Sequence, residues 1–218
     1  MSSEPSNLYT LEEFSSLLMP KIEIIDRVPP VTYDTNNWLW QNVLLYGAPG
    51  TGKSEGARKF AEIAAERYSS DMLAATNLER YIVEFLSAPF IEPKKIQLYF
   101  FDDLAGKRLP PNCQNEWILL RHTVQNITHL HNGLILTFIA TQRYYALDKA
   151  LRESITSLVA FSTPSNPFDA SIIKRFIGDE AYNFLEFQKF LLMTGQTQKH
   201  YAAFYLNGIR GIFFLTNA

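Results

Sequence analysis

One eight-residue motif constrains this chain more than any other feature of its sequence. The stretch Gly47–Ser54 fits the pattern GxxxxGK[ST] at every position. A short apolar run, Val43–Tyr46, precedes the motif, and residues 53–68 have a helical composition with small and apolar residues spaced along one face. The sequence therefore predicts a buried strand, a glycine-rich turn and a helix in direct succession.

The residue types in this turn predict what it binds. Glycines let the backbone curl so that its N–H groups point inward at phosphate oxygens, and the positive end of the following helix faces the same anion. A lysine adds a mobile charge for the β and γ phosphates, and a serine hydroxyl can coordinate Mg²⁺. We therefore predict that ATP is bound here. The predicted binding residues are Gly47, Ala48, Pro49, Gly50, Thr51, Gly52, Lys53 and Ser54.

An acidic pair follows a second apolar strand. Ile96–Phe101 is apolar and ends at Asp102 and Asp103. A carboxylate at a strand tip can hold Mg²⁺, usually through water, and the next acid can orient or deprotonate the attacking water. We assign Asp102 to the metal together with Ser54, and Asp103 to the water. The alternative is a solvated acidic turn after a core strand.

A third strand ends in polar residues. Residues 134–140 form an apolar run that leads into Thr141 and Gln142. Ligands of open α/β sheets bind at the carboxyl ends of the strands, so Gln142 could contact the γ-phosphate or the attacking water. Arg143 and Arg152 could stabilise charge on the transferred phosphoryl group, within one subunit or across to a neighbour. For either arginine alone, a surface role is equally compatible with the sequence.

The remaining pattern predicts an α/β fold with a mostly parallel central sheet flanked by helices. Strands alternate with helices through the middle of the chain, which favours parallel pairing. Asn207-Gly208 lies between two apolar and aromatic runs, which is a strong signal for a C-terminal β-hairpin. Strands are expected at 43–46, 81–86, 96–101, 134–140 and 157–161, and helices at 53–68, 114–131, 147–155, 168–177 and 180–193.

The chain is expected to consist of an N-terminal arm and one larger domain. Residues 1–9 read as a polar tail, and Thr10 with Glu13 has the spacing of a capping box ahead of a short helix. Prolines and asparagines between residues 29 and 37 then break regular structure. We predict an arm over residues 1–40 that carries the short helix, and a P-loop domain over 41–218.

Composition excludes several classes of protein. The 20 Lys and Arg against 22 Asp and Glu give a net charge of −2, which excludes coating of nucleic acid by bulk charge alone. The single cysteine, Cys113, excludes an internal disulfide framework and a multi-cysteine metal site. No apolar run approaches a membrane span, and no signal core follows Met1. We expect a soluble protein of a cell interior.

Three of these segments together resemble a known family. The phosphate loop at Gly47–Ser54, the strand end at Tyr99–Asp103 and the strand end at Ala140–Arg143 are similar to the FtsK–HerA superfamily of DNA-pumping ATPases. The small size and the closing hairpin look most like viral genome-packaging ATPases, such as those of the Sulfolobus turreted icosahedral viruses. The resemblance covers about residues 40 to 216. The Thr-Gln-Arg strand end is its discriminating part.

The resemblance implies a RecA-like core in a ring-shaped homo-oligomer, often a hexamer, around double-stranded DNA. It implies ATP-driven translocation into a capsid, with capsid or internal-membrane proteins as partners at a packaging vertex, in the host cytoplasm or on the virion. It makes Gln142 the strand-end sensor, and Arg143 or Arg152 the arginine finger. Asp103 departs from the family, because many relatives carry Glu there.

Other functions remain open on the sequence alone. An AAA+ remodeller or helicase loader would suit the phosphate loop, although its sensor would more often be Asn and its C-terminus a helical lid. A nucleotide or small-molecule kinase would need an acceptor site and an arginine-rich lid. A non-hydrolysing switch is less compatible with the pair Asp102 and Asp103.

Overall fold

A twisted sheet of eight strands runs through the part of the chain that the computed structural model describes, which is residues 7–19, 40–67, 73–74, 96–102, 106, 111 and 134–217. The strand order is β1-β8-β7-β6-β2-β5-β4-β3. The strands are β1 (Leu8–Tyr9), β2 (Trp40–Tyr46), β3 (Leu73–Ala74), β4 (Ile96–Phe101), β5 (Leu134–Thr141), β6 (Ser157–Ala160), β7 (Lys199–Leu206) and β8 (Ile209–Asn217).

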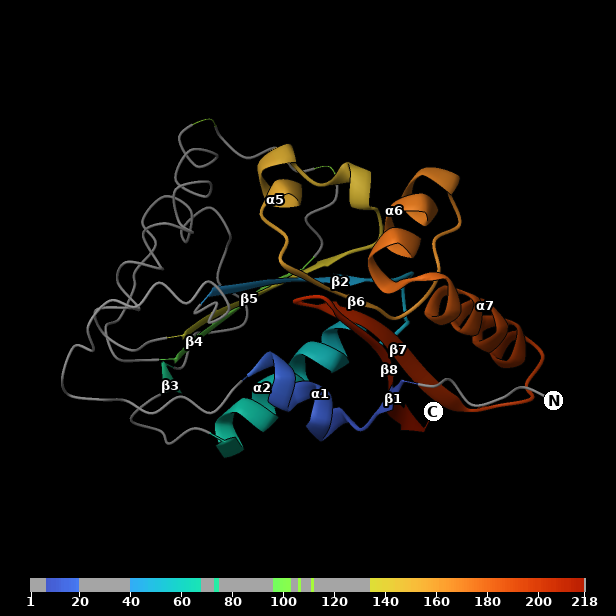
Figure 1. Ribbon diagram of the computed structural model, residues 1–218, viewed down its shortest axis with the longest axis horizontal. Helices are drawn as coiled ribbons and strands as arrows, with labels where there is room; N and C mark the ends of the chain where they lie inside the picture. Colours follow the sequence, from blue (N-terminus) through green and yellow to red (C-terminus); the bar gives the residue numbers. More distant parts are fainter. Residues whose placement is uncertain are drawn as a thin grey trace.

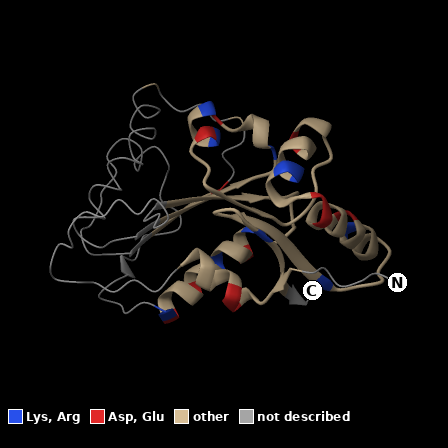
Figure 2. Cartoon of the chain, in the orientation of Figure 1, with Lys and Arg blue, Asp and Glu red and all other residues tan. Residues whose placement is uncertain are grey.

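Helices cover both faces of this sheet. In Figure 1, α1 and α2 lie below the sheet, and α5, α6 and α7 lie on the opposite side. Figure 2 shows basic and acidic residues interspersed on the helices. The helices are α1 (Leu11–Leu18), α2 (Lys53–Arg67), the 3₁₀ helix η1 (Tyr144–Ala146), α5 (Lys149–Glu153), α6 (Pro167–Ile177) and α7 (Asp179–Met193).

The centre of the sheet is parallel and its C-terminal part is a hairpin. Strand β2 pairs in parallel with β5 on one side and β6 on the other, and β4 pairs in parallel with β5. Strands β7 and β8 form an antiparallel hairpin, and β7 is antiparallel to β6. This architecture confirms the predicted P-loop NTPase fold, with its mostly parallel central sheet, flanking helices and C-terminal hairpin.

The order of the three central strands positions the site. Strand β2 leads into the phosphate loop and β4 leads into the acidic residues, but these two strands are not neighbours. Strand β5, which ends next to Gln142, lies between them. All three run in parallel, so their carboxyl ends meet at one edge of the sheet.

The sheet has an apolar core on each face because successive strand residues point to opposite sides. On β2, Leu44 and Tyr46 face a cluster that includes residues of α6 and α7. Val43 and Leu45 face the other cluster, which contains Phe14 of α1 and Phe60 of α2. Both faces of β2 are therefore buried, as its continuous apolar run predicts.

Residues 7–19 are built into this core. The predicted capping box is present: Glu13 N donates to Thr10 Oγ1 at 3.1 Å, and Thr10 N donates to Glu13 Oε2 at 2.7 Å. The ring of Phe14 stacks on Phe213 with centroids 4.6 Å apart. Strand β1, within the expected polar tail, pairs in parallel with β8. The predicted polar tail was therefore wrong at Leu8–Tyr9, because the distant strand β8 supplies a backbone partner for these two residues.

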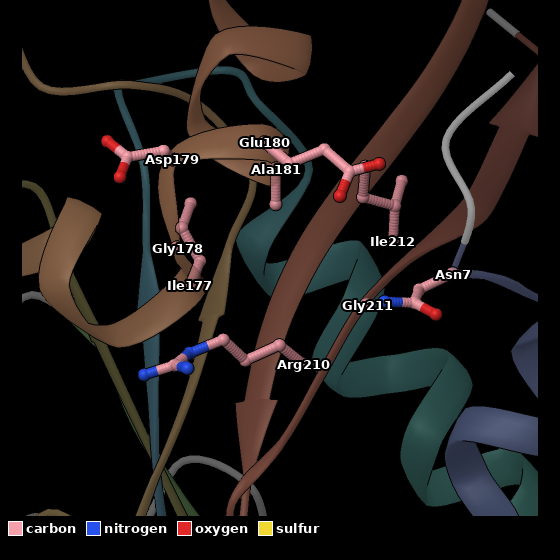
Figure 3. A pocket seen from close by; sticks show the side chains of 9 residues that line it. All are labelled: Asn7, Ile177, Gly178, Asp179, Glu180, Ala181, Arg210, Gly211 and Ile212. Atoms are coloured by element: carbon pink, nitrogen blue, oxygen red, sulfur yellow. The ribbon is translucent and has the colours of Figure 1, made fainter. Parts of the chain in front are cut away.

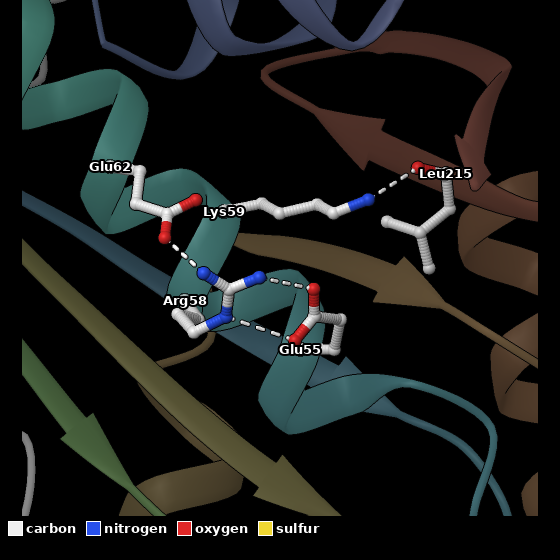
Figure 4. A network of polar contacts seen from close by, with 5 residues as sticks. All are labelled: Glu55, Arg58, Lys59, Glu62 and Leu215. Carbon is white, nitrogen blue, oxygen red and sulfur yellow. Dashed lines mark hydrogen bonds and ion pairs between the residues drawn. The ribbon is translucent and has the colours of Figure 1, made fainter.

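Helix α2 is tied to the hairpin by a polar contact. Lys59 Nζ donates to the carbonyl oxygen of Leu215 at 2.9 Å, which joins α2 to β8 (Figure 4). On the exposed side of the helix, Arg58 bridges Glu55 and Glu62. The hydrogen bond from Arg58 lowers the pKa of the Glu55 carboxyl below its ordinary value.

Most predicted elements are confirmed where the structure describes them. The predicted strands at 43–46, 96–101, 134–140 and 157–161 correspond to β2, β4, β5 and β6. The helix expected over 147–155 is shorter, as α5, with η1 ahead of it. The strand expected at 81–86 and the helix at 114–131 lie outside the described residues, as do residues 20–39, so the domain boundary at 40 stays a prediction.

Within the described ranges, no helix has both the length and the apolar character needed to span a membrane.

Candidate nucleotide-binding site

The phosphate loop has the backbone shape that its glycines allow. Gly50 and Gly52 have φ values of +73° and +92°, which residues with a side chain rarely adopt. At Gly47, a Cβ would lie 2.5 Å from Thr51 Oγ1, so a side chain there would collide with the loop itself. The backbone therefore favours glycine at positions 50 and 52, and the side chains of Thr51 and Phe161 leave little room for a Cβ at position 47.

The lysine of the motif lies inside the loop. The Lys53 ammonium donates to the carbonyl oxygens of Gly47 and Ala48 at 2.8 and 2.9 Å, and the residue is only 9% exposed. Lysine is rarely this buried without polar partners. The same ammonium can donate to phosphate oxygens that enter the loop, as the sequence predicts.

Neighbouring strands support the loop from two sides. Gly47 N donates to the carbonyl of Thr141 at the end of β5, at 3.2 Å. Ala48 N donates to the hydroxyl of Ser162, just after β6, at 2.9 Å. Sequence reasoning missed Ser162, because nothing local distinguishes it from other loop serines.

Ser54 and Asp102 come together although their elements are separated by β5. The Ser54 hydroxyl donates to Asp102 Oδ2 at 3.1 Å. Ser54 lies in the first turn of α2, and Asp102 follows β4 directly. A hydroxyl and a carboxylate are oxygen ligands of the kind that Mg²⁺ prefers. The oxygen atoms of Ser54 and Asp102 therefore fit the predicted Mg²⁺.

The described residues contain no group of three or more His, Cys, Asp or Glu side chains that could hold a metal. A metal at Ser54 and Asp102 would thus depend on few protein ligands and on phosphate oxygens, which is how Mg²⁺ is commonly bound beside nucleotides. Asp103, predicted to act on the attacking water, lies outside the described residues.

Gln142 and Arg143 lie at the carboxyl edge of the sheet, immediately after β5, and both are exposed. The buried side chain of Thr141 fixes their backbone. Arg143 N donates to Thr141 Oγ1 at 3.2 Å, and the same hydroxyl donates to the Arg143 carbonyl at 3.1 Å. The predicted placement of Gln142 at a strand end is confirmed, while its role stays a prediction.

Arg152 lies beside the segment that follows Arg143. Its guanidinium carbon is 6.0 and 5.4 Å from the ring centroids of Tyr144 and Tyr145 in η1. Both distances are within the range of cation–π interactions. The fold therefore brings both candidate arginines to η1, Arg143 as its N-cap residue and Arg152 from α5.

Sequence reasoning missed a buried acid next to these residues. Asp169, 1% exposed, lies in the first turn of α6 and accepts hydrogen bonds from Tyr46, Tyr144 and Tyr145. Burial is the main cause that raises the pKa of the Tyr46 phenol above its ordinary value, and the nearby Asp169 charge adds to it. The sequence signal at Asn166-Pro167-x-Asp169 is that of a helix start, and nothing in it indicates these distant donors.

A separate small cavity lies between the start of α7 and strand β8 (Figure 3). Its volume is about 140 Å³, and Asn7, Gly178, Glu180 and Arg210 are among the residues that line it. Arg210 Nε donates to the carbonyl of Phe176 at 2.6 Å. None of the predicted nucleotide-binding residues lines this cavity.

Comparisons with solved structures find viral packaging enzymes. The genome packaging NTPase B204 from Sulfolobus turreted icosahedral virus 2, in complex with sulfate, has a TM-score of 0.47 and 14% identity, over 82% of this chain and 96% of that chain. Its complex with ATP-gammaS gives 0.46 and 15%, over 82% and 98%. The packaging ATPases that the motifs resemble are thus among the solved structures similar to this chain.

One curated relative is a plant protein, Protein SUPPRESSOR OF K(+) TRANSPORT GROWTH DEFECT 1 of Arabidopsis thaliana. It is 28% identical over 158 residues, which cover 67% of this chain and 36% of that protein. The chain therefore spans about a third of the length of this relative.

A family model matches more than half of the chain. The model is nSTAND3, Novel STAND NTPase 3, and the match covers residues 34–177. These residues run from before β2 to the end of α6, so they include the phosphate loop, Asp102 and the segment from Gln142 to Arg152. The matched region thus holds the whole candidate site, and the chain belongs to the Novel STAND NTPase 3 family.

Proposed function

We propose that this NTPase hydrolyses ATP in a Mg²⁺-dependent reaction at the carboxyl edge of the sheet. The observation that carries the proposal is the 3.1 Å contact between Ser54 and Asp102 next to the glycine loop that surrounds Lys53. A phosphate-binding loop needs only glycines and a lysine, whereas hydrolysis also needs a place for a metal beside the phosphates. The contact supplies oxygen ligands at that place.

Each predicted residue has a role in this proposal. The backbone of Gly47–Ser54 and the Lys53 ammonium bind the phosphates, and Ser54 with Asp102 holds Mg²⁺, which would neutralise charge on the phosphate oxygens. Gln142 contacts the γ-phosphate or the attacking water, and Asp103 orients that water. Arg143 or Arg152 stabilises charge on the phosphoryl group that is transferred.

We further propose that hydrolysis moves double-stranded DNA into a viral capsid, by a ring of identical subunits, a hexamer being the expected form. The support is the resemblance of the motifs at Gly47–Ser54, Tyr99–Asp103 and Ala140–Arg143 to DNA-pumping ATPases. The partners in this proposal are duplex DNA and capsid or internal-membrane proteins at a packaging vertex, in the host cytoplasm.

The AAA+ alternative predicts a different C-terminal region. Such a remodeller would carry a helical lid after the core, whereas residues 199–217 return to the sheet as the hairpin of β7 and β8. The hairpin is continuous with the core, because Phe204 and Phe213 are fully buried in it. This feature favours the DNA motor over the remodeller.

The test is steady-state ATP hydrolysis with and without long double-stranded DNA. We expect activity that EDTA abolishes, that duplex DNA stimulates, and that Lys53→Ala reduces to background by removing the charge at the phosphates. Activity indifferent to DNA would reject the motor and favour the remodeller. ATP binding without hydrolysis, at an affinity that Lys53→Ala does not change, would reject the proposed ATPase.

A further inference from the structure

A buried carboxylate joins three segments that are far apart in sequence. Asp169 Oδ2 accepts from the Tyr144 amide at 3.0 Å and from the Tyr46 hydroxyl at 3.3 Å, and Oδ1 accepts from the Tyr145 amide at 3.2 Å. Burying a charged side chain is costly unless donors of this kind compensate it. Both carboxylate oxygens thus accept hydrogen bonds, yet the proposed hydrolysis makes no direct use of Asp169.

These contacts close a circuit of hydrogen bonds at the root of the phosphate loop. The circuit starts at Gly47, whose amide donates to the Thr141 carbonyl, and Thr141 holds Arg143 through its hydroxyl. The next two amides, in η1, donate to Asp169. Asp169 in turn accepts from Tyr46, the residue just before Gly47.

Gln142 lies within this circuit. Its backbone is held on one side by strand β5 and Thr141, and on the other by the bonds between η1 and Asp169. Its side chain is exposed, so it can reach a ligand while its backbone stays fixed. A small displacement of such a group would slow the reaction, since a shift of about 1 Å at a reacting centre can lower the rate by a factor of roughly a hundred.

We propose that Asp169 is a positioning residue, which fixes Gln142 and Arg143 relative to the phosphate loop through η1 and Tyr46. The proposal rests on the proposed function, because it assigns Gln142 a place beside the γ-phosphate. Asp169 itself touches neither nucleotide nor metal in this scheme. It sets the distance between the loop that binds the phosphates and the side chain that responds to them.

The substitution Asp169→Asn tests the carboxylate at nearly constant volume. An amide has one acceptor oxygen, and its NH₂ group is a donor. If the NH₂ replaces Oδ1 it faces the Tyr145 amide, and if it replaces Oδ2 it faces the Tyr144 amide and the Tyr46 hydroxyl. Either orientation places donors against donors and loosens η1.

Asn166→Ala is the matched control at the same helix start. Asn166 Oδ1 accepts from Asp169 N at 2.9 Å and caps α6, and the described contacts of this side chain include none to η1 or Tyr46. Loss of this cap weakens the start of α6, typically by about 1 kcal/mol. A role in helix stability alone would therefore affect both variants alike.

Three measurements separate the outcomes: kcat for ATP, the Kd of Mg·ATP, and hydrogen exchange of the Tyr144 and Tyr145 amides. We expect Asp169→Asn to lower kcat by about tenfold to a hundredfold while the Kd changes by less than about threefold. We expect the amides of Tyr144 and Tyr145 to exchange faster than in the wild type in Asp169→Asn, but not in Asn166→Ala. Asn166→Ala should keep kcat within about twofold of the wild type.

Equal losses of kcat in the two variants, or unchanged exchange at Tyr144 and Tyr145 in Asp169→Asn, would overturn the positioning role. If the wild type hydrolyses no nucleotide, the proposed function fails by itself. The exchange measurement then still decides the positioning role. That role stands only if ATP binding slows the exchange of the Tyr144 and Tyr145 amides in the wild type and not in Asp169→Asn.

Discussion

At the scale of single residues, Tyr46 shows how a side chain gains a chemical partner that its sequence context does not indicate. It ends an apolar run and is 2% exposed, as a core residue would be. Its hydroxyl nevertheless meets Asp169, which is 123 residues away along the chain. The phosphate loop could be predicted because its chemistry is local, whereas Asp169 could not, because its donors come from distant segments.

The raised pKa of Tyr46 predicts a loss of stability in alkali. The phenol must lose a proton less readily in the folded state than in the unfolded chain, where its pKa is near the ordinary 10.0. This contribution to stability is complete below that value and is lost as the pH rises past it toward the folded pKa. We expect the free energy of unfolding to fall less steeply above about pH 10 in Tyr46→Phe than in the wild type.

Urea unfolding of both proteins from about pH 8 to 11 measures this slope. Tyr46→Phe should also be less stable near neutral pH, by about 0.5–1.5 kcal/mol, because it lacks the hydrogen bond to Asp169. Parallel curves for the two proteins across the alkaline range would contradict the assignment of the raised pKa to Tyr46.

At the scale of elements, helix starts were predictable and short strands were not. The capping box of Thr10 and Glu13 lies within four residues, so the sequence alone indicates where α1 begins. Strand β1 has two residues, and it exists only because β8 provides backbone partners. Its pairing depends on the assembled sheet, which no local pattern encodes.

Loss of the cap should weaken α1 and, through it, the whole fold. Thr10→Ala removes the acceptor for Glu13 N, and we expect a loss of about 1 kcal/mol in the free energy of unfolding. Glu13→Gln is the control, because glutamine keeps an acceptor for Thr10 N. The measurement is the denaturation midpoint at constant m-value. An unchanged midpoint in Thr10→Ala would contradict the capping role, and a loss in Glu13→Gln would show that the charge of Glu13 contributes as well.

At the scale of the whole molecule, aromatic rings from both ends of the chain share one core. The ring of Phe14 contacts Phe60, Phe204 and Phe213, with centroid distances of 5.4, 4.7 and 4.6 Å. The sequence predicted each segment separately. It could not predict that they meet, nor that β5 lies between β2 and β4, because alternation of strands and helices does not specify lateral strand order.

Removal of the Phe14 ring should lower the free energy of unfolding of the entire domain. Phe14→Ala leaves a cavity between α1, α2 and the hairpin, and we expect a loss of about 3–5 kcal/mol. The matched control is Phe190→Ala on α7, because Phe190 is 55% exposed and its loss should change stability by no more than about 0.5 kcal/mol. Thermal and urea unfolding measure both. A small effect of Phe14→Ala would show that α1 contributes little to the core.

The pairing of β1 with β8 also dictates when the protein can complete its fold during synthesis. Leu8 and Tyr9 reach their partners, Ile212 and Phe213, only after roughly 200 further residues have been made, and such long-range closure is slow. Until the hairpin of β7 and β8 leaves the ribosome, the Phe14 ring lacks its contacts with Phe204 and Phe213, and that part of the core stays uncovered. Nascent chains that stall before residue 209 should therefore bind chaperones that recognise exposed aromatic surface.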